Sequence, residues 1–299
     1  MIYKMKLRMT VILIVLLFLP VISFSQDGPF NDEVFGAVSA DGVNFKVLAG
    51  PFFSHASVPD VLELEKDCPV GSKGTLILYF VDFSEVIGPG SEGISMATSK
   101  DGINWSGKNK ITIEGKVNKG AAVDPSVIQL PDGRIRLYFF GSDITQGDPA
   151  RHPGDHNIYS AISDDGINFK LESGVRFSAP FITDPEVIRT DDEWLMFLSR
   201  GAQTLLARSD DGLDFALDND FYLEIGGVPG AVALHDGRVR VFATGRDGII
   251  SAVFNPDLNS APAIEAGNRI GRGTAAIVAD PAVIIRSDGM HYLIFKKKP

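Results

Sequence analysis

The heptapeptide Ser99-Lys100-Asp101-Gly102-Ile103-Asn104-Trp105 is one copy of a string that decides the fold. An Asp-Gly pair after an alternating apolar segment is typical of a tight β-hairpin turn, in which Ser and Asp cap backbone groups and Gly takes a positive φ. The aromatic residue that ends the string is expected to pack between neighbouring sheets. Further copies occupy residues 39–45, 163–169 and 209–215, and residues 255–258 resemble a degraded fifth copy. We interpret these turns as structural, and they predict repeated hairpins.

A second string, in which Pro is followed two positions later by Val or Ala, occurs five times. Each copy predicts the start of a short buried strand, because the first residue of a strand can be Pro without losing a ladder hydrogen bond. A second apolar strand follows each copy, in three cases through an Asp-Gly turn. The five copies are Val58-Pro59-Asp60-Val61, Asp124-Pro125-Ser126-Val127, Asp184-Pro185-Glu186-Val187, Val228-Pro229-Gly230-Ala231 and Asp280-Pro281-Ala282-Val283.

Together the two strings predict five four-stranded sheets. The chain begins with an outer hairpin, residues 34–48, and ends with an inner hairpin, residues 282–295, so that the two ends would complete one sheet. This arrangement closes a ring and removes exposed sheet edges, as in a β-propeller. We therefore predict an all-β, five-bladed β-propeller whose last blade is closed by N-terminal and C-terminal strands, with residues 26–299 as one domain.

Residues 1–25 have the pattern of a secretory signal peptide. Lys4, Lys6 and Arg8 precede an apolar run over residues 11–21, and small residues precede a cleavage site before Gln26. The run is shorter than the ~20 residues that a membrane span needs. We therefore expect a secreted or periplasmic protein that has no membrane contact after cleavage.

Composition excludes several classes of partner and site. Of the 299 residues, 274 follow the cleavage site, and they carry 25 basic and 38 acidic side chains, a net charge of −13. Such an acidic chain repels phosphate backbones, so nucleic acid is not an expected partner. Cys68 is the only cysteine, which excludes an intrachain disulfide and a thiolate zinc cluster. We expect a monomer that is held together by its core.

The propeller prediction gathers polar residues at one rim of the central channel. The inner strands line the channel, so residues just before them meet at one rim, and the second strand of each hairpin returns to the same rim. The candidates before the inner strands are His55, Asp124, Asp184, Glu224 and Asp280, and those after the second strands are Asp82, Asp143, Arg200, Arg246 and Lys296. Neighbouring carboxyls drive their pKa values apart, which acid/base chemistry on a sugar requires.

These candidates receive different roles. We predict Asp124, Asp184, Asp280 and Glu224 as catalytic acids, and His55, Arg200, Arg246, Asp82 and Asp143 as substrate ligands. An Asp before Pro also has a structural interpretation as a turn residue. However, two of the five copies carry Val there, so the fold does not require Asp. The two arginines could equally pair with the buried aspartates.

The longest irregular insertion, residues 141–157, includes His152, His156, Asp148 and Asp155, but the spacing of these residues matches no specific metal-ligand pattern. We expect no cofactor and no catalytic metal, and the channel leaves room for a structural divalent ion.

The Asp-Pro-x-Val/Ile strands, followed by an Asp-Gly turn and a strand with Tyr or Phe, resemble the five-bladed propeller glycosidases of glycoside hydrolase family 43 and its relatives in family 32. The closest stretch is residues 123–128, continued by residues 132–138. In that group three acids from successive blades serve as base, pKa-tuning Asp and acid Glu. The resemblance implies that Asp124 and Asp184 match two of these positions. The acid Glu of the group sits in a Glu-Gly-Pro string, where this chain has Val228-Pro229-Gly230.

We therefore expect an enzyme, a glycoside hydrolase that acts on a poly- or oligosaccharide through carboxylates in the central funnel. Asp124 would be the base, Asp184 its tuner, and Glu224 or Asp280 the acid. An inverting reaction would need carboxyls about 6.5–9.5 Å apart. The alternative, favoured by the missing Glu, is a non-catalytic carbohydrate-binding propeller. A third hypothesis is a metal-dependent hydrolase that uses the insertion at residues 141–157.

Overall fold

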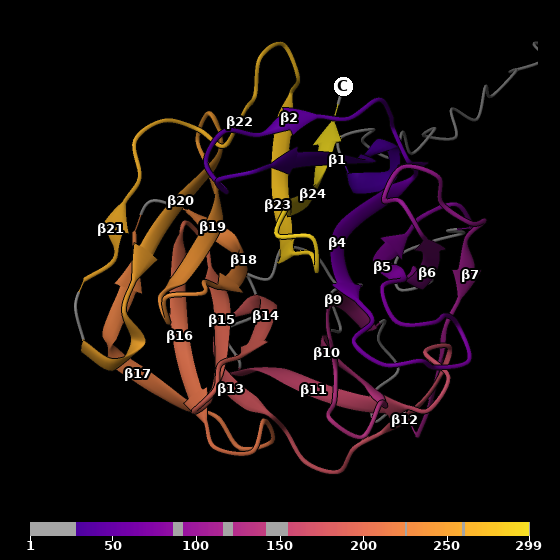
Figure 1. The fold of residues 1–299 in the computed structure, drawn as a ribbon. Helices are drawn as coiled ribbons and strands as arrows, with labels where there is room; N and C mark the ends of the chain where they lie inside the picture. The colour runs from indigo at the N-terminus through magenta and orange to yellow at the C-terminus, as the bar shows by residue number, and fades with distance from the viewer. Residues whose placement is uncertain are drawn as a thin grey trace, which may run out of the picture.

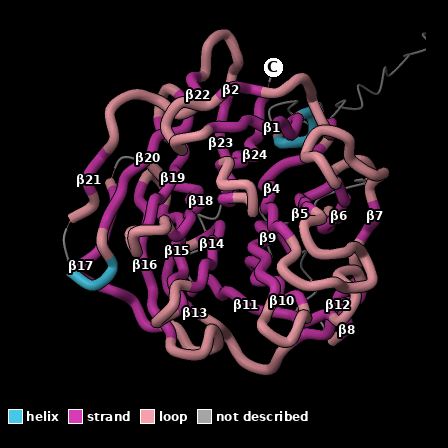
Figure 2. Tube along the Cα trace, in the orientation of Figure 1, coloured by secondary structure: helices cyan, strands magenta, loops and turns pink. Residues whose placement is uncertain are grey.

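The computed structural model describes residues 28–85, 92–115, 122–141, 155–224, 226–258 and 261–298. These residues form five β-sheets that stand around a common axis (Figure 1). The inner strand of each sheet contacts the inner strands of both neighbouring sheets, which closes the ring. Strands and loops make up nearly all of the described chain, apart from two short 3-10 helices (Figure 2). The predicted all-β, five-bladed propeller is confirmed.

We number the sheets as blades I to V around the ring, and give the strands of each from the axis outward. Blade I contains β4 (Ala56–Glu63), β5 (Leu76–Asp82), β6 (Gly93–Ser99) and β7 (Asn109–Lys110). Blade II contains β9 (Ala122–Gln129), β10 (Ile135–Gly141), β11 (Asp155–Ser163) and β12 (Asn168–Leu171), joined by β8 (Thr112–Glu114) and β13 (Phe177–Pro180). Blade III contains β14 (Thr183–Arg189), β15 (Trp194–Arg200), β16 (Gln203–Ser209) and β17 (Ala216–Leu223).

Blades IV and V complete the ring. Blade IV contains β18 (Gly227–Ala233), β19 (Val239–Gly245), β20 (Gly248–Phe254), β21 (Ala263–Ile264) and β22 (Ile270–Gly271). Blade V contains β23 (Ile277–Ile285), β24 (His291–Lys298), β1 (Glu33–Ser39), β2 (Lys46–Val47) and β3 (Phe53–Ser54).

Blade V combines the two ends of the described chain. β1 pairs antiparallel with β24 in a register that runs from Glu33 opposite Lys297 to Ser39 opposite His291. In Figure 1 the indigo strand β1 accordingly lies beside the yellow strand β24. This sheet confirms the predicted closure, and it links the first and last described strands by a full hydrogen-bonded ladder.

The core is divided among the interfaces between blades. Five clusters of buried apolar side chains each join one pair of neighbouring blades. The second strands are buried on both faces and therefore read as continuous apolar runs, as in Leu76–Asp82, whose first six residues are all buried. Removing this apolar surface from water stabilises the ring at about 25 cal/mol per Å².

The Ser-x-Asp-Gly turns connect the two outer strands of a blade, at the rim opposite the one that was predicted to gather the acids. In the copy at residues 163–169, the N–H of Gly166 donates to Ser163 Oγ (2.9 Å), and Asp165 Oδ1 accepts the N–H groups of Ile167 and Asn168 at 2.8 and 2.7 Å. Gly166 has a φ of 74°, which favours glycine. Its carbonyl accepts a hydrogen bond from Tyr79 of the preceding blade (2.8 Å). The turn is therefore structural, as predicted.

The degraded fifth copy differs from the other four. Pro256–Leu258 form a 3-10 helix there. The guanidinium of Arg208 from the preceding blade donates to the Pro256 carbonyl (3.3 Å). The contact between blades is thus kept although the turn is replaced.

Candidate functional site

The residue before Pro in every inner strand has a left-handed backbone, and this bulge carries the predicted acids. The φ angle is 53° at Asp124, 49° at Asp184 and 53° at Asp280. Val58 and Val228 adopt the same conformation, with φ of 45° and 48°, although a β-branched side chain disfavours it. Pairing with the second strand shifts register at this point in all five blades. The bulge thus places five equivalent side chains around one rim, and three of them are carboxyls, which we call the aspartate cluster.

Asp124 and Asp184, on neighbouring blades II and III, form an interacting pair. Asp124 is 8% exposed, and its carboxylate accepts the backbone N–H of Asp184. Burial, then the charges of Asp184 and Asp280, raise the pKa of Asp124 well above its ordinary value. Burial and the Asp280 charge also raise the pKa of Asp184, to about 6, although the Thr183 hydroxyl donates to it (2.6 Å). The pair can therefore hold one protonated and one ionised carboxyl near neutral pH.

Asp280 lies on blade V, between the blades that carry Val58 and Val228. Its carboxylate forms an ion pair with Lys296. Lys296 Nζ lies 2.8 Å from Asp280 Oδ2 and 3.4 Å from Asp32 Oδ2. It also donates to the Ser57 hydroxyl (3.2 Å). Asp280 Oδ2 further accepts the backbone N–H of Val58 (3.3 Å), so the carboxylate also fixes the bulge of the next blade.

Burial and ion pairing shift the pKa values of Asp32 and Lys296. Burial raises the pKa of Asp32, against the lowering effect of Lys296. Burial alone would lower the pKa of Lys296, but the charges of Asp280, Asp32 and Asp184 raise it above its ordinary value. Lys296 therefore stays protonated. Lys296 was a candidate from the sequence because it follows the second strand of its hairpin. Asp32 was not a candidate, because it precedes an outer strand and belongs to neither repeated string.

Asp82 lies at the end of β5 and has its own cation. Lys108 Nζ is 2.8 Å from Asp82 Oδ1, and the hydroxyls of Ser84 and Ser95 donate to the carboxylate at 2.6 and 2.9 Å. Burial would raise the pKa of Asp82, but these hydrogen bonds bring it below its ordinary value. Asp82 is thus an ionised group that is already satisfied by protein partners.

Other predicted residues lie outside the aspartate cluster. Arg200 donates to Gln203 Oε1 (3.1 Å), and Gln203 Nε2 donates in turn to Glu224 Oε1 (3.4 Å), so these exposed residues form a chain of contacts on blade III. Within the described ranges, no hydrogen bond or ion pair joins Arg200 or Glu224 to the aspartates.

The remaining predicted ligands have varied positions. His55 is exposed, has a φ of 55°, and its Nδ1 lies 2.7 Å from the Phe30 carbonyl oxygen. Arg246 is exposed in the turn after β19. Asp143 lies outside the described residues, as does residue range 1–27 with the predicted signal peptide.

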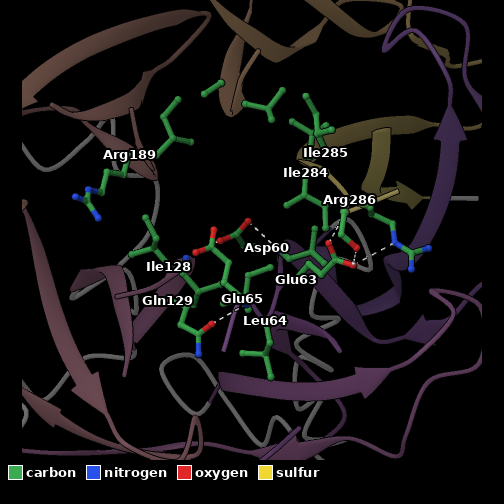
Figure 3. A pocket seen from close by; sticks show the side chains of 18 of the residues that line it. Asp60, Glu63, Leu64, Glu65, Ile128, Gln129, Arg189, Ile284, Ile285 and Arg286 are labelled. Carbon is green, nitrogen blue, oxygen red and sulfur yellow. Dashed lines mark hydrogen bonds and ion pairs between the residues drawn. The ribbon is translucent and has the colours of Figure 1, made fainter. Parts of the chain in front are cut away.

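A cavity of about 730 Å³ opens at the opposite end of the channel (Figure 3). The last residues of the inner strands line it, with apolar side chains such as Leu64, Ile128 and Ile284. The guanidinium of Arg286 lies 3.8 Å from Glu63 Oε1 at its edge. The cavity is therefore separate from the aspartate cluster, which lies at the starts of the same strands.

Two buried carboxyls, Asp60 and Glu186, also line this cavity (Figure 3). Asp60 Oδ2 accepts the N–H of Val127 on the next blade (2.6 Å), and Glu186 Oε1 accepts the N–H of Ala231 on the next (3.0 Å). Ser126, at the equivalent position of blade II, makes the same kind of contact to blade III (2.9 Å). Because a serine accepts the equivalent backbone N–H, these carboxyls are best explained as hydrogen-bonded links between blades. This role was not predicted from the sequence, although Asp60, Ser126 and Glu186 are each the third residue of the Pro-containing string.

Two further properties concern metals and membranes. In the described ranges, no group of three or more His, Cys, Asp or Glu side chains is arranged to hold a metal ion. None of the helices among the described residues is long and apolar enough to cross a membrane.

The fold is shared with several solved structures, although no protein-family model and no curated protein matches the sequence. One is a thermostable family-43 glycoside hydrolase, with 13% identity and a TM-score of 0.57 over 80% of this chain and 88% of that chain. Another is an N-acetylgalactosamine deacetylase from F. plautii, with 12% identity and a TM-score of 0.58 over 86% and 82%. A third is a family 32 β-fructofuranosidase from Bombyx mori, with 18% identity and a TM-score of 0.55 over 80% of this chain and 54% of that enzyme. The chain therefore has the fold of the family 43 and family 32 propellers, as the repeated strings indicated.

Proposed function

We propose that this protein is an exported glycoside hydrolase that cleaves a poly- or oligosaccharide at the aspartate cluster. The observation that carries the proposal is the Asp124–Asp184 pair, in which a buried and a half-buried carboxyl on neighbouring blades have raised and interacting pKa values. A proton donor and a charged carboxylate in one site are what glycosidic bond cleavage needs. Enzymes named as glycoside hydrolases of families 43 and 32 share the fold, which supports the substrate class.

The raised pKa values let the pair share one proton. The member that holds the proton would be the general acid, and its ionised partner would be the base or nucleophile. Asp184, with a pKa of about 6, would be ionised above that pH and act as base or nucleophile. Asp280, bound to Lys296, would provide fixed negative charge for the developing oxocarbenium ion. The family resemblance implied another division, with Asp124 as base, Asp184 as its tuner and Glu224 or Asp280 as acid.

The test is hydrolysis of an oligosaccharide panel by the wild type and by Asp124→Asn and Asp184→Asn. Each amide variant should lose at least about 100-fold in kcat, because general acid or base catalysis contributes a factor of this size. Exposed Asp164→Asn is the matched control and should hydrolyse at the wild-type rate. Full activity in Asp124→Asn and Asp184→Asn would remove the aspartate cluster from the reaction.

One observation favours a second candidate, a carbohydrate-binding propeller without hydrolytic activity. Val58 and Val228 occupy two of the five equivalent rim positions, and the exposed Glu224 contacts Gln203 rather than the cluster. The deacetylase among the similar structures also indicates that the fold alone does not determine the reaction. Isothermal titration with the same saccharides distinguishes the two candidates, because binding without release of reducing ends indicates the second.

A further inference from the structure

Phe181 is an exposed aromatic residue at the acid end of the channel. It lies in the crossover between β13 of blade II and β14 of blade III, three residues before Asp184. Its side chain is 42% exposed, whereas the next residue, Ile182, is fully buried. The crossover therefore anchors itself through Ile182 and presents the Phe181 ring at the rim.

Neither backbone conformation nor burial explains a Phe at this position. Phe181 has a φ of 62°, in the left-handed region that disfavours residues with a Cβ. A glycine or asparagine would fit this backbone better, and a polar residue would suit the exposure better. Strained backbone at a rim position is a common property of ligand-binding sites.

The orientation of the ring is supported from one side. The His156 ring packs edge-on against Phe181, with centroids 6.3 Å apart and planes at 66°. His156 is itself fixed, because its Nδ1 lies 2.8 Å from the Ile182 carbonyl oxygen and its ring packs on Phe140 at 5.3 Å. Phe140 is 3% exposed and belongs to the core between blades II and III. The exposed Phe181 ring therefore packs on His156, and His156 packs on the buried Phe140 of the core.

An apolar ring at the same rim as carboxylates matches the chemistry of a sugar. One face of a pyranose or furanose ring carries C–H groups that pack on an aromatic face, while its hydroxyls donate to carboxylates. Asp184 follows Phe181 on the same rim, with Thr183 donating to its carboxylate. We propose that Phe181 is a stacking platform for one sugar ring of the substrate, next to Asp184, an inference that rests on the proposed carbohydrate chemistry of the aspartate cluster.

The corresponding crossover between blades V and I supports this interpretation. There His55 occupies the position three residues before Val58, is exposed, and also has a positive φ of 55°. Phe30, whose carbonyl oxygen contacts His55, is 41% exposed and packs edge-on against Phe83 at 5.5 Å. Aromatic groups thus stand at two corners of the same rim.

The experiment compares saccharide binding by the wild type, Phe181→Ala, Phe181→Gly and Phe181→Tyr. The probes are xylotetraose, arabinotetraose, kestose and a trisaccharide that contains N-acetylgalactosamine. KM is measured for those that are cleaved, and Kd by titration calorimetry for those that are not. Ile103→Ala is the matched control, because Ile103 is 51% exposed in a turn at the far rim. Phe181→Gly relieves the backbone strain and keeps the test valid should Phe181→Ala fold poorly.

We expect KM or Kd to rise by about tenfold in the Ala and Gly variants, the effect of one lost aromatic contact. Phe181→Tyr and Ile103→Ala should bind as the wild type does, and kcat should change less than twofold in every variant. Unchanged binding in the Ala and Gly variants would overturn the role of Phe181 as a stacking platform. If the wild type still hydrolyses a saccharide in that case, the proposed function stands. Weakened binding without any hydrolysis keeps the platform and rejects the hydrolase. A wild type that binds none of the saccharides overturns both.

Discussion

Lys296 determines how negative charge is distributed at the acid rim. Its ammonium group contacts Asp280 and Asp32, and its charge also lowers the pKa values of Asp124 and Asp184. In Lys296→Met the pKa of Asp184 should rise above about 6, because burial and the Asp280 charge would act without this opposing cation. Activity that needs ionised Asp184 appears as pH rises through its pKa. The acid limb of kcat/KM should therefore move to higher pH by about one unit, measured with a saccharide that the wild type cleaves.

The same substitution should also lower stability, since it leaves buried carboxylates without their cation. We expect a loss of about 3 kcal/mol in the free energy of unfolding, measured by urea denaturation. Lys296→Arg keeps the charge and is the control for both measurements. An acid limb that stays in place in a folded Lys296→Met would show that Lys296 has no influence on the reacting carboxyls.

At the scale of the element, the Ser-x-Asp-Gly turn depends on its Asp. Asp165 accepts hydrogen bonds from Ser163 Oγ and from the backbone N–H groups of Ile167 and Asn168. Asp165→Ala removes these caps and should lower the free energy of unfolding by about 1–2 kcal/mol, read as a lower Tm. The exposed neighbour Asp164 provides the control, because Asp164→Ala should leave Tm unchanged. Equal effects of the two substitutions would contradict the capping role.

Elements that repeat could be predicted from the sequence, and single contacts between elements could not. The turns and inner strands recur with fixed spacing, so the blade count, the closure by β1 and β24 and the rim positions of Asp124, Asp184 and Asp280 followed from pattern. Glu224 follows β17 outside both repeated strings, where spacing does not determine the direction of a side chain, so its role stays a prediction. Asp32 approaches Lys296 through a tertiary contact that no local pattern encodes.

At the scale of the whole molecule, buried side-chain acceptors link blades I to IV near the axis. The backbone N–H groups of Val127 and Ala231 are accepted by Asp60 and Glu186 of the preceding blades. Asp60 also accepts the N–H of its own neighbour, Val61 (2.8 Å), because blade V carries Ala282 where an acceptor would be needed. Burial raises the pKa of Asp60 to about 7, and burial with the Asp60 charge raises that of Glu186 well above its ordinary value.

These raised pKa values make the stability of the ring depend on pH in a defined direction. The folded chain retains protons that the unfolded chain loses above pH 4 to 5, so the free energy of unfolding should fall as pH rises from about 4 to 7. Glu186→Gln keeps an acceptor for Ala231 but cannot ionise in either state. It should match the wild type near pH 4 and exceed its stability by on the order of 3 kcal/mol near pH 8, in urea denaturation across that range. Asp236→Asn, in an exposed turn, is the control and should not reproduce the gain. A stability difference between Glu186→Gln and wild type that is the same at pH 4 and pH 8 would mean that Glu186 has no raised pKa and that its link between blades III and IV is already ionised.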